Sequence, residues 1–232
     1  METTHNSEAG FATSRERDLL LRWTNYHAAL LSLTALLALS IHQPWLVFAA
    51  GGVSFFALIL LHWNRWTERK SLGMANAVTL LRLIGILLLS MVPTSLITVI
   101  GLLLVGADGF DGWIARRLDR RSHFGDYFDK ETDAFFLLIL CLLAISHGLL
   151  APWILVAGML RYALVVLRWL VRPEILTARK SQTARVIYIM AMVGLLICFL
   201  PLPPIRDPIA GLATLILIYS FAGDFRQVFS PE

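Results

Sequence analysis

Four aspartates between residues 108 and 133 are the strongest candidates in this chain for metal binding and catalysis. Asp108 and Asp111 lie three residues apart, and Asp129 and Asp133 lie four residues apart. Residues with either spacing share one face of a helix, so each pair would present two carboxylates together. Four clustered carboxylates repel one another at neutral pH, and oxygen ligands favour a hard divalent cation. The sequence therefore predicts that all four aspartates bind Mg²⁺ or Mn²⁺.

The aspartates belong to a longer pattern, which reads D-x2-D-G-x2-A-R-x8-G-x3-D-x3-D. This pattern resembles the signature of the CDP-alcohol phosphotransferase family, also called CDP-alcohol phosphatidyltransferases, and it matches at every defining position. The resemblance implies that the remaining fixed positions line the pocket for a CDP-linked donor. They are Gly112, Ala115, Arg116 and Gly125.

The resemblance also implies a reaction, in which a phosphatidyl group passes from CDP-diacylglycerol to a small polar alcohol and CMP is released. Asp108, Asp111 and Asp129 would hold one or two metal ions, and Asp133 would bind metal and act as the general base. Two alternatives stay open. CDP-choline or CDP-ethanolamine would donate to diacylglycerol, or the protein would be an ion-coupled transporter. Neither inverted repeats nor paired broken-helix signals support the transporter.

The composition is that of a polytopic membrane protein, because 57% of the residues are hydrophobic and 16% are charged. A membrane-crossing helix needs about 20 mostly apolar residues. Eight runs reach or approach this length, and the sequence therefore predicts an all-α integral membrane protein. The runs are 26–42, 45–62, 76–93, 95–116, 131–148, 151–171, 184–201 and 207–224.

The resemblance divides these runs into two groups. It implies a catalytic bundle of six transmembrane helices, here residues 73–232, preceded by an interfacial helix near residues 63–70. Residues 1–72 would then hold an N-terminal tail, two additional transmembrane helices and the interfacial segment. The resemblance further implies a homodimer.

Basic residues are concentrated in alternate loops and in both terminal segments, whereas the opposite loops hold only Arg206. The positive-inside rule places both termini and the aspartate loop in the cytoplasm. We expect a multi-pass protein, most simply of a bacterial inner membrane, with its active site at the cytoplasmic face. The net charge of +4 suits anionic lipid, and we expect no nucleic-acid partner.

Two further groups of residues are candidates for substrate binding. Asn76, Thr79 and Arg82 form an N-x2-T-x2-R stripe that resembles the family's N-terminal substrate-binding element, and they are predicted to bind the CDP donor. Arg161 lies near the middle of an apolar run, where a lone Arg is costly unless it is paired or faces water. We expect it to bind a phosphate or to balance the aspartates.

The segment 179–183 resembles a G-K-x-K-T element of some family members, in which Lys180 and Thr183 match. These two residues are predicted to bind the acceptor together with Arg161. Several cations near one mouth favour an anionic acceptor such as glycerol 3-phosphate. The chain also lacks the proline and the final lysine of the D-P-x-x-D-K element that many glycerol-phosphate-using members carry, so the acceptor stays open.

Overall fold

The computed structural model describes residues 3–61, 74–118, 123–171 and 182–229, and only the backbone of residues 3–16, 74–75, 108–118, 123 and 182. Within these ranges the chain is all-helical, as predicted, with eight α-helices, two short 3₁₀ helices and no strand. The predicted interfacial segment lies outside the described residues. The α-helices are α1 (Thr3–Ile41), α2 (Trp45–Leu61), α3 (Met74–Leu88), α4 (Thr94–Leu118), α5 (His123–Ser146), α6 (Leu155–Val171), α7 (Gln182–Ile197) and α8 (Pro203–Phe229).

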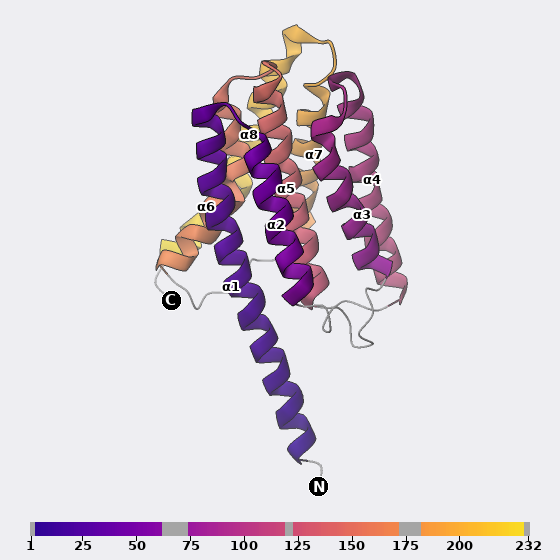
Figure 1. Ribbon diagram of the computed structural model, residues 1–232, viewed down its shortest axis with the longest axis vertical. Coiled ribbons are helices and arrows are strands. Elements are labelled where there is room, and N and C mark those ends of the chain that lie inside the picture. The colour runs from indigo at the N-terminus through magenta and orange to yellow at the C-terminus, as the bar shows by residue number, and fades with distance from the viewer. Residues whose placement is uncertain (1–2, 62–73, 119–122, 172–181, 230–232) are drawn as a thin grey trace.

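The helices form one bundle with α5 in its interior (Figure 1). Helices α1, α2, α3, α6 and α7 all pack against α5. The C-terminal ends of α2, α4 and α6 lie at the same end of the bundle as both chain termini (Figure 1). We call this the site end, because α4 and α5, which carry the aspartate pattern, are joined there.

The central position of α5 follows from its sequence. Every side chain from Ala134 to Ala144 is buried, and this stretch has no polar residue other than Cys141. A helix that is apolar all round has no face to offer to water and is stable in the interior of a bundle. The surrounding helices instead direct large apolar side chains outward, including Phe56, Leu103 and Leu215.

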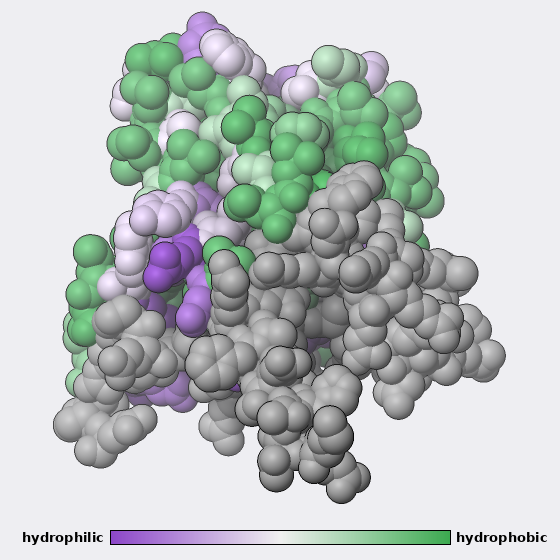
Figure 2. Space-filling model, turned by 60° about the horizontal axis from the view of Figure 1, so that its bottom comes forward, coloured by the Kyte–Doolittle hydropathy of each residue, from purple (hydrophilic) through white to green (hydrophobic). Residues whose placement is uncertain are grey.

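Three helical segments are long and apolar enough to cross a membrane, namely Arg17–Ile41, Pro152–Val171 and Pro203–Phe229. Four shorter apolar helices accompany them. In Figure 2 apolar side chains cover most of the upper, coloured part of the bundle, and a patch of hydrophilic side chains lies below them on the left. The chain is therefore a membrane protein, and the division into six plus two spanning helices stays a prediction.

Helix α1 begins much earlier than the predicted run at residue 26. No proline occurs between residues 3 and 41, so no residue type there forces the helix to stop before the membrane. As a result α1 extends beyond the bundle at the site end (Figure 1).

Helix α6 closely approaches α5 at Gly158. A Cβ atom at this position would lie 2.9 Å from the Cα atom of Leu138 and 3.3 Å from the sulfur of Cys141. Small residues allow two membrane helices to approach backbone to backbone in this way. Gly158 therefore sets the distance at which α6 packs on the central helix.

Replacing Gly158 with alanine should destabilise the protein by about 1–2 kcal/mol, because the methyl group would push α6 away from a backbone that cannot yield. Gly211→Ala in α8 is the matched control, since a Cβ atom there has no neighbour within 4 Å. Thermal unfolding in detergent measures both. Equal melting temperatures for the two variants would contradict this account of the α5–α6 contact.

Candidate active site

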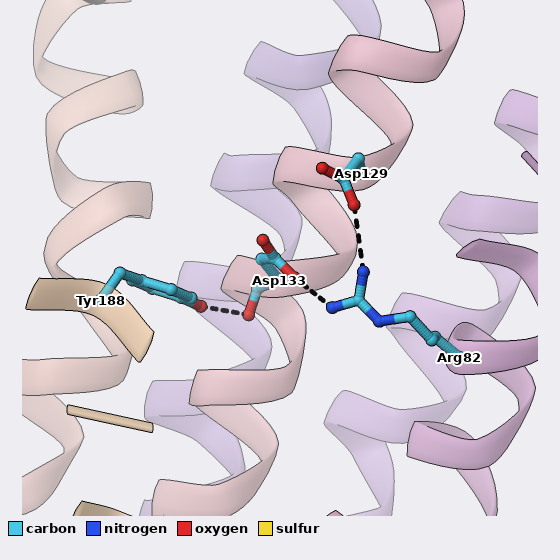
Figure 3. Close-up of polar contacts among 4 residues, drawn as sticks. All are labelled: Arg82, Asp129, Asp133 and Tyr188. Atoms are coloured by element: carbon cyan, nitrogen blue, oxygen red, sulfur yellow. Dashed lines mark hydrogen bonds and ion pairs between the residues drawn. The ribbon is translucent and has the colours of Figure 1, made fainter. Parts of the chain in front are cut away.

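One arginine binds two of the four aspartates (Figure 3). Nη1 of Arg82 donates to Oδ1 of Asp129 over 3.0 Å, and Nη2 donates to Oδ1 of Asp133. Because Asp129 and Asp133 lie four residues apart on α5, both carboxylates project from the same side of the helix. The two prongs of the guanidinium thus span one turn of α5, a geometry that a lysine could not reproduce.

The stripe on α3 faces the interior of the bundle at this point. Asn76 and Thr79 are buried, as is Arg82, which is 1% exposed. Their three-residue spacing keeps them on one face of α3, and α3 packs against α5. The structure therefore places the predicted donor-binding stripe in the interior of the bundle and brings one of its residues, Arg82, to the aspartates of α5.

Arg82 is more deeply buried than the two aspartates that it binds. The side chain of Arg82 is only 2% exposed, whereas those of Asp129 and Asp133 are 38% and 25% exposed. A buried guanidinium is tolerated when its charge is balanced and its N–H groups are bonded. The carboxylates lie between Arg82 and the exterior, so a ligand can still reach them.

The first aspartate pair lies on α4, and its side chains are outside the description. The backbone shows that Asp108 lies ten residues before the last residue of α4 and that Asp133 lies ten residues after the first residue of α5. At 1.5 Å per residue both are about 15 Å from the ends of their helices. Since α4 and α5 are joined at the site end, the two aspartate pairs lie at similar depths.

The remaining predicted residues are placed in part. Gly125 lies in the first turn of α5 and is half-buried, and Thr183 is exposed in the first turn of α7. Both belong to the site end. Only the backbone is described for Gly112, Ala115 and Arg116. Lys180 lies outside the described residues.

Tyr188 on α7 contacts the same turn of α5 from another side (Figure 3). Its hydroxyl group donates a hydrogen bond to the backbone carbonyl of Asp133. A carbonyl oxygen has two lone pairs, so it can accept this bond in addition to its bond within the helix. Tyr188 therefore holds the backbone of a residue whose carboxylate is held by Arg82. The sequence analysis did not predict a role for Tyr188, because its position fits none of the patterns.

Arg161 is paired with Glu131 and not with a described aspartate of the pattern. Its Nε atom lies 3.3 Å from Oε2 of Glu131, and its Nη2 donates to Oε1. The side chain of Glu131 is fully buried, whereas that of Arg161 is 24% exposed. A buried carboxylate opposite a mid-helix arginine satisfies the requirement for a partner. The predicted binding of a phosphate by Arg161 stays a prediction.

The donor set fits a divalent cation. Asp129 and Asp133 already converge on a positive group, and the pattern supplies only carboxylate oxygens, which Mg²⁺ and Mn²⁺ prefer. Among the side chains that the structure describes, no three His, Cys, Asp or Glu residues are grouped to hold a metal ion. Asp108 and Asp111 are not among those side chains.

Comparison with known proteins identifies the segment that carries this site. A family model described as CDP-alcohol phosphatidyltransferase matches residues 72–222. No curated protein and no solved structure shows a match. The matched segment contains all four aspartates and the residues that bind them, whereas α1 and α2 precede it.

Arg82→Met should destabilise the protein by about 1.5–3 kcal/mol, the usual contribution of hydrogen bonds to charged groups. The change leaves Asp129 and Asp133 facing each other without their shared cation. Adding Asp129→Asn should recover part of the loss, because the repulsion between the carboxylates disappears. A double-mutant cycle of thermal or denaturant unfolding measures this coupling. Strictly additive effects would show that the two groups do not interact.

Proposed function

Because this chain belongs to the CDP-alcohol phosphatidyltransferase family, whose model covers most of its length, we propose that it transfers a phosphatidyl group from CDP-diacylglycerol to a small polar alcohol. CMP would be the second product. The observation that supports this best is the pair Asp129 and Asp133, held by Arg82 within the matched segment. A family of transferases also favours an enzyme over the ion-coupled transporter.

In the proposed reaction the acceptor hydroxyl attacks the phosphorus atom that carries the lipid. Asp133 accepts the proton of that hydroxyl as the oxygen–phosphorus bond forms, and the bond from phosphorus to CMP breaks. Arg82 and Tyr188 keep Asp133 in place through its side chain and its backbone, respectively. Fixing a base before the reaction removes the cost of orienting it in the transition state.

A divalent cation, Mg²⁺ or Mn²⁺, would be held by Asp108, Asp111, Asp129 and Asp133. When bound, it would neutralise the pyrophosphate and stabilise CMP as the leaving group. The exposed faces of Asp129 and Asp133 are compatible with this role. The residues proposed to bind the CDP donor are Asn76, Thr79, Arg82, Gly112, Ala115, Arg116 and Gly125.

For the acceptor we propose a site that includes Arg161, Lys180 and Thr183. Arg161 is paired with Glu131 but still partly exposed, so it has surface left to contact a phosphate. Cationic side chains that lie close together are most stable when an anion binds between them, which favours glycerol 3-phosphate over a neutral acceptor. We further propose that the site faces the cytoplasm of a bacterial inner membrane and that the enzyme is a homodimer.

The purified protein, supplied with CDP-diacylglycerol, should release CMP and form a new phospholipid. The acceptors to compare are glycerol 3-phosphate, serine, inositol, inositol phosphate and choline, and we expect the highest rate with glycerol 3-phosphate. Activity should disappear in excess EDTA and return with Mg²⁺ or Mn²⁺, because the carboxylates need a counter-cation. If product formed only from CDP-choline or CDP-ethanolamine and diacylglycerol, the lipid would be the acceptor and not part of the CDP-linked donor. Full turnover in EDTA would show that the reaction does not require a divalent cation.

Two aspartate variants separate the base from the metal ligands. Asp133→Asn should lower kcat by about 10²-fold or more, the usual contribution of a general base, while the donor still binds. Asp108→Ala should remove turnover and weaken donor binding together. Equilibrium binding of a CDP donor, measured beside the rate, distinguishes them. An equal loss of donor affinity in both variants would show that the proposed division of roles is wrong.

A further inference from the structure

Helices α1 and α2 lie outside the segment matched by the family, yet they pack on its central helix. Two polar contacts tie them to each other. Nε1 of Trp23 donates to the backbone carbonyl of Ser54 over 3.0 Å, and Nδ1 of His27 lies 2.7 Å from the hydroxyl oxygen of the same serine. The rings of Trp23 and His27 are stacked, with centroids 4.6 Å apart. The two helices therefore form one unit.

Phe55 on α2 connects this unit to α5. Its ring is 1% exposed and lies 4.9 Å from that of His27, 6.0 Å from that of Phe128 and 5.5 Å from that of Phe135, measured between centroids. Gly51 lies one turn before Phe55, and a Cβ atom there would overlap the ring of Phe135. The contact between α2 and α5 is thus aromatic, buried and closely fitted.

The face of α5 that receives these contacts is opposite the face of the aspartates. Phe128, Glu131 and Phe135 follow one another at spacings of three and four residues, so they share a face. Glu131 is two residues from both Asp129 and Asp133, which places it about 160° around the helix from each. A displacement of α5 on the aromatic face must therefore move the carboxylates on the other.

Helix α1 also lies beside the ion pair on this face. The ring of His27 lies 6.1 Å from that of Tyr162, the residue next to Arg161. His27, Glu131 and Tyr162 are all buried. A fully buried carboxylate in a membrane helix requires that lipid be kept from it, and α1 packs against both α5 and α6.

We propose that α1 and α2 are a positioning element of the enzyme. Through Phe55, Gly51 and His27 they fix the rotation and depth of α5, and thereby the place of Asp129 and Asp133 against Arg82. Helices that served only as a membrane anchor would not require a glycine fitted against a ring of the central helix. The effect on kcat rests on the proposed function. The effect on the structure of α5 rests on the packing alone and is tested separately, by hydrogen–deuterium exchange.

Adjacent glycines supply the sharpest experiment. Gly51→Ala should lower kcat by about tenfold or more, because a displacement near 1 Å is enough to misalign a catalytic group. KM for the CDP donor should rise as well, because α5 also carries Asp129 and Gly125 of the proposed donor site. Gly52→Ala is the matched control in the same turn of the same helix, since a Cβ atom there lies 3.8 Å from Leu87, an ordinary contact. Adding Phe135→Leu to Gly51→Ala removes the overlapping ring atoms and should restore kcat.

A second pair covers the case in which Gly51→Ala fails to fold. Phe55→Leu should reduce kcat in the same way, whereas Phe56→Leu, on a side chain that is 62% exposed, should not. Thermal unfolding of each variant shows whether a lower rate is due only to a smaller fraction of folded enzyme. The inference is overturned if the folded Gly51→Ala and Phe55→Leu enzymes keep the kcat of their controls, or if Phe135→Leu does not rescue Gly51→Ala.

Hydrogen–deuterium exchange separates this inference from the proposed function. In Gly51→Ala the amides of residues 129–137 should exchange faster than in Gly52→Ala, whatever substrate the enzyme uses. Release of CMP by the unaltered protein tests the proposed function by itself. Unchanged exchange in all variants would refute the positioning role even in an active enzyme, and changed exchange would support it even if CDP-diacylglycerol proved to be the wrong donor.

Discussion

The need to balance the charges on one turn of α5 determines where the neighbouring helices lie. Asp129 and Asp133 project to one side of the helix, and a single buried guanidinium from α3 binds both. Unpaired charges at this depth would be too costly to keep. The pairing therefore requires α3 to lie beside α5 with Arg82 at the height of the two carboxylates. The position of α3 in the bundle follows from this requirement as much as from apolar packing.

The same turn carries a third carboxylate on its other side. Glu131 needs a cation of its own, and Arg161 supplies it from α6. Two arginines from two helices therefore hold α5 from opposite directions, and Tyr188 adds a hydrogen bond from α7. A helix held in this way must lie in the centre of the bundle. The apolar run from Ala134 to Ala144 then fills the core farther from the site end than the charges.

Much of this arrangement could be predicted from residue types and spacing. The aspartate pattern identified the family, and the length and hydropathy of the apolar runs predicted an all-helical membrane protein. The partner of Arg161 was not found, because a partner on another helix depends on how two helices are rotated against each other, which spacing within one helix does not reveal. One signal was available: the aspartate pattern assigns no role to Glu131, an acid at the start of an apolar run, just as it assigns none to the mid-helix Arg161. Tyr188 gave no such signal, since its hydroxyl binds a backbone carbonyl.

The two faces of α5 also explain how helices outside the family segment can affect the chemistry. Phe55 touches Phe128 and Phe135, on the side of α5 away from the carboxylates. Any influence on Asp129 and Asp133 must therefore pass through the body of the helix. A helix transmits rotation and translation well, because its backbone hydrogen bonds make it stiff over a single turn and packed interiors yield little to strain. The fit of Gly51 against Phe135 acts at the place where a small shift of α5 would be carried directly to both aspartates.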